Sequence, residues 1–185
     1  MWRGQHFATR PVGLADYDFL VAAAVESPEE WTRVFADFPP DPITLLNQIL
    51  HGVISQYLVF DPNDADQDYP VGVIALYNAS FRHGHAWIDL CCVPQRSTDP
   101  ETSRLHSVVA LLEFAFAHWG FRKLYASHLG FQSSPFAVLD ASAQSEAVFP
   151  DWYRHNNLYW DRTISAITRP AWSAARPRAL AAVGL

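Results

Sequence analysis

Two side chains that can carry a proton lie within one apolar stretch of the sequence, residues 85–93 (HAWIDLCCV). Asp89 stands between an isoleucine and a leucine, and burial there would raise the pKa of its carboxyl group toward the range of a general base. The alternative is that Asp89 is a hydrogen-bonded polar residue on the solvent side of a strand. His85 is the second candidate, because the ordinary pKa of an imidazole suits proton transfer.

The histidines and cysteines of this region predict neither a metal site nor a reactive thiol. His83 and His85 are two residues apart and would share a strand face, but a zinc site needs further ligands and none is suggested nearby, so no metal site is predicted. The only cysteines, Cys91 and Cys92, are adjacent and would point to opposite faces, which disfavours a mutual disulfide. They are expected to be reduced, buried and unreactive thiols, as suits a cytoplasmic protein.

The next segment, residues 94–103 (PQRSTDPETS), could bind a phosphate group at the start of a helix. In that interpretation Arg96 supplies a cation, and hydroxyls and amides come from Ser97, Thr98, Thr102 and Ser103. In the other interpretation Asp99 caps the helix, Pro100 is its first residue and Glu101 adds a favourable charge. The residues alone leave both interpretations open.

Length and composition bound the class of protein. The 185 residues are expected to form one domain over 1–172 with a flexible tail at 173–185. Half of the residues are hydrophobic, which is enough for a large core, and the net charge of −6 argues against nucleic acid or an anionic membrane as the main partner. With no signal peptide and no apolar run of membrane-spanning length, a cytoplasmic monomer or homodimer is expected.

Hydrophobic periodicity predicts an α/β (α+β) fold with a single mixed, mostly antiparallel sheet and helices on both of its faces. In chain order the expected elements are a strand at 6–10, helices beginning near Asp16 and at Pro42, meander strands at 56–60, 71–80 and 85–93, a helix at 99–118, a strand at 122–129, a short helix, and a hairpin turning at Asn156-Asn157. The site candidates therefore lie on the last meander strand and at the start of the following helix.

This order of elements, together with four segments, resembles the GNAT-type N-acyltransferases, and most closely their ribosomal-protein and antibiotic-modifying branch. FATRPVGLADYDFL (7–20) resembles the opening strand and helix of that branch, in which an Arg-Pro pair precedes an acidic residue. PVGVIALYN…HAWIDLCCV is similar to the central meander of the family, and VVALLEFAFAHWGFRKLYA is similar to its cofactor helix and following strand. WYRHNNLYWDRTISAITRPAW is similar to its final hairpin and closing Trp.

The resemblance implies a cleft between strands 85–93 and 122–129 that holds acetyl-CoA or another acyl-CoA as co-substrate. A backbone amide of residues 90–93 would polarise the thioester carbonyl, and Asp89 or His85 would take the proton of the amine. The implied donor-binding residues are Leu90, Cys91, Cys92, Val93, Gln95, Arg96, Ser97, Thr98, Thr102 and Ser103. The sequence departs from the family where two spaced glycines are usual, near Pro100 and Thr102, because proline has no N–H to offer a phosphate.

A second departure concerns the family's Asn and the Tyr that protonates the leaving thiolate. Neither is found between Ala126 and Trp152, where Ser133 and Ser134 stand instead. Six aromatic residues are numerous enough to line an acyl or acceptor pocket, although core and rim positions are the preferred interpretation: Trp2, Trp31, Phe35, Phe38, Tyr57 and Tyr77.

The leading hypothesis is an acyl-CoA-dependent N-acyltransferase acting on a small-molecule or peptide amine. One alternative is a catalytically inactive GNAT-like binding domain that has lost the phosphate loop. The other is an acyltransferase that receives its acyl group from an acyl carrier protein, whose acidic surface would meet Arg96, Arg104, Arg122 and Lys123.

Overall fold

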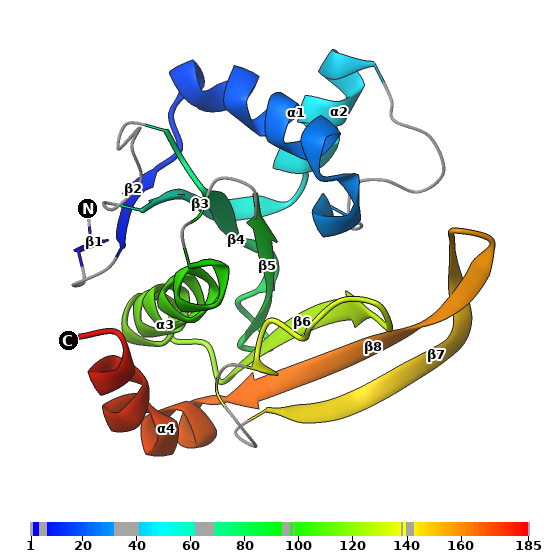
Figure 1. The fold of residues 1–185 in the computed structure, drawn as a ribbon. Coiled ribbons are helices and arrows are strands. Elements are labelled where there is room, and N and C mark those ends of the chain that lie inside the picture. Colours follow the sequence, from blue (N-terminus) through cyan, green and yellow to red (C-terminus); the bar gives the residue numbers. More distant parts are fainter. Residues whose placement is uncertain are drawn as a thin grey trace.

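The computed structural model describes residues 2–3, 7–31, 41–61, 69–93, 97, 99–137, 139 and 143–184. Its strands form one eight-stranded sheet in the order β1-β2-β3-β4-β5-β6-β8-β7 (Figure 1). The strands are β1 (Trp2–Arg3), β2 (Ala8–Pro11), β3 (Val53–Phe60), β4 (Gly72–Ser80), β5 (His85–Cys92), β6 (Lys123–Leu129), β7 (Gln144–His155) and β8 (Leu158–Thr168). Neighbouring strands are antiparallel except β5 and β6, which run parallel. The predicted mixed, mostly antiparallel sheet is confirmed.

Helices cover both faces of this sheet, as predicted. The helical elements are η1 (Leu14–Asp16), α1 (Tyr17–Glu26), η2 (Pro28–Trp31), α2 (Pro42–Leu50), α3 (Pro100–His118) and α4 (Arg169–Ala182). Figure 1 shows α1 and α2 on one side of the sheet and α3 with α4 on the other. Successive side chains of β5 point to opposite faces of the sheet and so contribute to both cores. Cys91 packs in the core under α1 and α2, whereas Leu90 and Cys92 pack in the core under α3.

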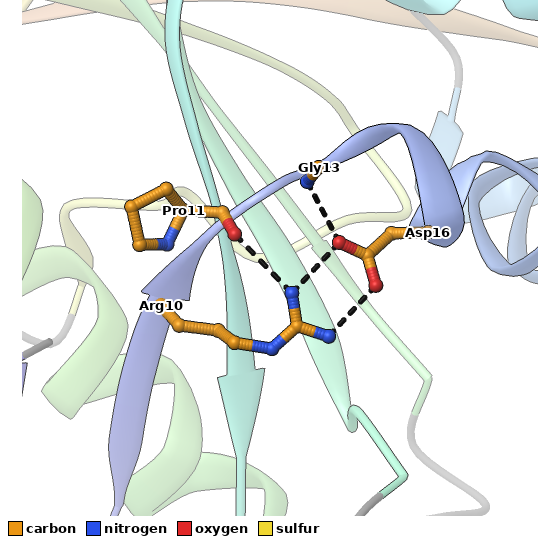
Figure 2. A network of polar contacts seen from close by, with 4 residues as sticks. All are labelled: Arg10, Pro11, Gly13 and Asp16. Atoms are coloured by element: carbon orange, nitrogen blue, oxygen red, sulfur yellow. Dashed lines mark hydrogen bonds and ion pairs between the residues drawn. The ribbon is translucent and has the colours of Figure 1, made fainter.

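The Arg-Pro pair and the acidic residue of the opening segment form a local lock between β2 and α1 (Figure 2). The Arg10 guanidinium donates two hydrogen bonds of 2.7 Å to the Asp16 carboxylate, which also accepts the Gly13 N–H at 2.7 Å. These bonds hold the pKa of Asp16 below its ordinary value, the Arg10 bond being the largest cause. Asp16 is the N-cap residue of α1, but its carboxylate makes no capping hydrogen bond to that helix and joins the end of β2 to the turn before α1.

Two local predictions from turn and cap residues are confirmed. Asp41 accepts the N–H groups of Ile43 and Thr44 at the start of α2, with Pro42 as its first residue. Asn156 and Asn157 have φ of 51° and 62° and form the two-residue turn between β7 and β8. Within α2, Leu45 and Ile49 face the core and are buried, whereas Ile43 is 74% exposed.

Most of the C-terminal segment predicted to be a flexible tail, residues 173–182, is helical, since α4 continues to Ala182. Pro177 lies inside this helix, where an interior proline removes a backbone hydrogen bond. Tertiary packing outweighs that cost: Trp172, Ala175, Ala179 and Val183 are buried. Arg176 of α4 also donates two 2.7 Å hydrogen bonds to Glu113 of α3.

The parallel pair β5 and β6 separates along its length. His85, Ala86 and Trp87 pair with Lys123, Leu124 and Tyr125, and the ladder ends there. Beyond this point β5 rises toward α1 and α2 in Figure 1, whereas β6 runs off to the right. We call the stretch between residues 88–92 and 126–129 the split. None of the described helices is both long and apolar enough to span a membrane.

Candidate functional site

The β5 edge of the split carries backbone groups that β6 does not bond. The Val93 N–H donates to Val71 on the β4 side, while the Gly84 carbonyl accepts from Arg122 on the β6 side. Because backbone direction alternates along a strand and the last paired residues are Trp87 and Tyr125, the Ile88 C=O and the N–H and C=O groups of Leu90 and Cys92 face the split. Leu90, one of the residues predicted to contact the donor, therefore presents its N–H there.

Asp89 points to the α1–α2 side of the sheet and lines a small cavity of about 110 Å³ beside the split. The cavity is completed by Tyr77 of β4, Ser127 and Leu129 of β6, Trp152 and Tyr153 of β7, and Arg162 of β8. Residues from both sides of the split thus meet around one carboxylate. The structure places Asp89 half-buried in the wall of this cavity.

His85 shares the face of Asp89 but lies elsewhere. Its ring contacts Tyr125 edge to face at 5.7 Å and stacks with His83 at 6.3 Å, at the end where β5 and β6 are paired. The four residues to Asp89 correspond to roughly 13 Å along an extended strand. The two predicted proton carriers are therefore not brought together, and only Asp89 lines the cavity.

The start of α3 has the capped geometry that the second interpretation of residues 94–103 described. The Asp99 side chain accepts the Thr102 N–H at 3.1 Å, its carbonyl accepts the Ser103 N–H at 3.0 Å, and Pro100 is the first helical residue. Ser103 is buried, and Ser97 is half-buried. Both helix amides named as phosphate contacts are thus engaged within the chain. Gln95, Arg96 and Thr98 lie outside the described residues.

The short helix η2 lies across the far end of the split, next to the last residues of β5. The Cys92 N–H, which faces the split, donates to the Glu30 carboxylate. Glu30 also pairs with Arg104 of α3 at 3.5 Å, and the Cys91 thiol donates to the Glu30 carbonyl at 3.4 Å. Burial is the largest influence on Glu30 and raises the pKa of its carboxyl group.

The turn after β6 holds η2 from the opposite side of the split. Gln132 donates to the Glu29 carbonyl and accepts the Leu129 N–H at 2.8 Å. Together with the contacts of Glu30, this joins the ends of β5, β6 and α3 through one helical turn. Glu29 and Glu30 of η2 therefore close the far end of the split.

The two thiols at the end of β5 are buried, as expected. Burial raises the pKa of Cys92 to about 12, so that its thiolate is absent at neutral pH. Cys91 packs in the α1–α2 core. Neither geometry supports a nucleophilic cysteine.

The four basic residues predicted to meet an acyl carrier protein do not form one cluster among the residues that the structure describes. Arg104 is at the start of α3 with Glu30, whereas Arg122 and Lys123 begin β6 at the paired end. Arg122 donates to the His83 carbonyl at 2.9 Å, and Lys123 pairs with Glu146. Arg96, the remaining member, lies outside the described residues.

The aromatic candidates divide between core and cavities. Trp31 is buried in the α1–α2 core, and Tyr77 lines the cavity beside Asp89. Tyr57 lines a different, larger cavity of about 450 Å³ between α3 and strands β2 to β4, on the other face of the sheet. Phe35, Phe38 and the side chain of Trp2 lie outside the described residues.

Sequence reasoning missed the residues that chain segments far from β5 bring to the site. Glu30 comes from the short helix η2, and Trp152 and Arg162 come from the C-terminal hairpin. The available signals were an acidic pair directly before a tryptophan, and a lone arginine in an otherwise uncharged strand segment, RTISAIT. Neither signal indicates which distant element the side chain will meet.

Comparison with known proteins adds structural neighbours. No family model and no curated protein sequence matches the chain. A GCN5-related N-acetyltransferase from Brucella melitensis is similar in structure, with a TM-score of 0.69, 17% identity, and coverage of 97% of this chain and 83% of that one. So is a spermidine N-acetyltransferase from Vibrio cholerae in complex with CoA and spermine, with a TM-score of 0.69, 15% identity and coverage of 90% and 98%.

A ribosomal-protein-S5-alanine acetyltransferase from Vibrio fischeri is a further neighbour, with a TM-score of 0.69, 12% identity and coverage of 92% and 97%. These neighbours cover nearly the whole chain at identities too low to carry individual residue roles. What they share with it is the arrangement of strands and helices. The chain therefore has the fold of the GNAT N-acetyltransferases, as the resemblance implied.

Proposed function

We propose that the protein is an acyl-CoA-dependent N-acyltransferase that transfers an acyl group to the amine of a small or peptidic acceptor. The observation that carries this proposal is the meeting of Asp89 with residues of β6, β7 and β8 in one cavity beside the split. The similarity to an N-acetyltransferase in complex with CoA and spermine supports acetyl-CoA or a longer acyl-CoA as the donor.

In this proposal the thioester lies in the split with its carbonyl oxygen on the Leu90 N–H. A backbone amide aimed at that oxygen stabilises the negative charge of a tetrahedral intermediate. The amine nitrogen attacks from the cavity, and Asp89 takes the proton that the nitrogen loses. The C–N bond forms, the C–S bond breaks, and CoA leaves as a thiolate. A thiolate leaves without a dedicated acid, since an ordinary thiol has a pKa of about 8.5.

The direct test is turnover of acetyl-CoA and longer acyl-CoAs with a panel of amines, followed by mass spectrometry of the N-acyl product and by release of free CoA thiol. Asp89→Asn should lower kcat/KM about 100- to 10,000-fold, the usual contribution of a general base. Asp18→Asn, which changes an exposed carboxylate on α1, serves as the control and should leave the rate unchanged. Turnover that is insensitive to Asp89→Asn would contradict the assigned role.

A second candidate is a GNAT-like binding domain without catalytic activity. It is favoured by one specific arrangement: Glu30 already occupies the Cys92 N–H, and the Thr102 and Ser103 amides are engaged by Asp99. This candidate predicts no calorimetric binding of CoA and no product with any amine. Binding of CoA together with product formation would exclude it.

A further inference from the structure

Arg162 is the cation of the cavity that holds Asp89. It extends from β8 across β6, where its Nε donates a 2.7 Å hydrogen bond to Ser127 Oγ. Its guanidinium carbon lies 5.6 Å from the centroid of the Trp152 ring. A hydroxyl on one side and an aromatic face on the other fix the plane of the guanidinium while leaving its two terminal nitrogens for other contacts.

Arg162 forms no ion pair with a carboxylate in the part of the chain that the structure describes, although Asp89 lines the same cavity. By contrast, Arg10 and Arg176 each donate two 2.7 Å hydrogen bonds to a carboxylate. A half-buried guanidinium whose terminal nitrogens bond no described carboxylate favours binding an anionic ligand, because such a ligand replaces lost hydration with charge-assisted hydrogen bonds.

The hairpin is built so that Trp152 reaches this position. The register of β7 and β8 shifts between Phe149 and Tyr153, and Asp151 there has a φ of 50°. The Asp151 N–H donates to the Asp161 carboxylate at 3.0 Å, which anchors the irregular stretch to β8. This contact also directs Asp161 toward the backbone of the bulge. The aromatic ring over Arg162 is therefore held by a bulge, a device that commonly re-aims a side chain next to a site.

We propose that the acceptor is an amine that carries an anionic group a few bonds away, as an α-amino acid or an aminophosphonate does, and that Arg162 binds that group. The inference rests on the proposed function for its chemistry. Asp89 faces the amine and Arg162 faces the acid, so the cavity has one charge for each end of a zwitterion. Its volume of about 110 Å³ equals roughly four water molecules, which suits a compact head group.

The test compares matched acceptors that differ only in the acid. L-α-amino acids are assayed beside their amides and their decarboxylated amines, with aminoalkylphosphonates as a second type of anion and acetyl-CoA as donor. We expect kcat/KM to favour the acids over the amides about 10- to 100-fold, the range for hydrogen bonds to charged groups. Arg162→Gln should abolish that preference, and Arg162→Lys should restore part of it.

Arg154→Gln is the matched control, because Arg154 lies exposed on the same hairpin and contacts Asn157. It should leave the preference for acids unchanged. Calorimetric binding of the same acceptors without donor separates this inference from the proposed function. Binding of acids that depends on Arg162 without any turnover supports the inference and contradicts the enzyme. Turnover or binding that is equal for acids and amides, or a preference that survives Arg162→Gln, overturns the inference.

Discussion

Replacing Glu30 by alanine should strengthen CoA binding, because the carboxylate of Glu30 occupies a backbone amide that faces the split. The Cys92 N–H donates to Glu30, and Glu30 also pairs with Arg104 at 3.5 Å. A donor whose chain runs along β5 must take this amide and move Glu30 away. Its apparent affinity is then lowered by the free energy needed to break the resident contacts.

The magnitude follows from the contacts. A hydrogen bond to a charged group contributes about 1.5–3 kcal/mol, so removing Glu30 should lower the Kd for CoA about 10- to 100-fold. The same substitution should lower the free energy of unfolding by only about 1–2 kcal/mol, because burying the carboxylate is itself unfavourable. The raised pKa of Glu30, with burial as its largest cause, reflects that cost.

Isothermal titration of CoA into the wild type and Glu30→Ala measures the change directly, with urea unfolding as the measure of stability. Glu29→Ala is the control, since it removes an equal charge from an exposed neighbour and retains the carbonyl that Gln132 binds. It should leave the Kd within about twofold of the wild type, a change below roughly 0.5 kcal/mol. An unchanged Kd in Glu30→Ala, or an equal change in both variants, would refute the placement of Glu30 on the donor path.

Four further outcomes are expected. The pKa of Glu30 is raised in the folded state, so its contribution to stability is present below its ordinary value of 4.5 and lost as pH rises through the folded value; Glu30→Gln should flatten this loss in pH-dependent unfolding. The pKa of Asp16 is lowered, so its contribution is present above 3.8 and lost as pH falls through the folded value; Asp16→Asn should lower the unfolding free energy at pH 7 by about 1–2 kcal/mol in urea titrations. Cys91 and Cys92 should resist alkylation at pH 8 and react fully in denaturant, as mass spectrometry would report; rapid labelling of the native protein would contradict their burial. Truncation after residue 174 should lower the Tm by several degrees or prevent folding, because it removes the buried Ala175, Ala179 and Val183; an unchanged Tm would restore the idea of a tail.

Local signals predicted the elements well because their causes are local. The cap and first proline of α2, the cap of α3 and the paired asparagines of the hairpin each depend on a few adjacent residues. The α4 helix was missed for the opposite reason: its interior proline is unfavourable locally, and only the buried residues facing α3 compensate.

The sequence by itself determined the order of elements, the GNAT-like fold and Asp89 as a candidate base, since periodicity, turns and one carboxylate in an apolar strand are readable along the chain. Only the tertiary structure decided what surrounds that carboxylate. Arg162 is 73 residues from Asp89 and Glu30 is 62 residues before Cys92, yet both lie at the same split. Such contacts depend on how β6, β7, β8 and η2 pack around β5, and no local propensity specifies the distance or direction between those elements.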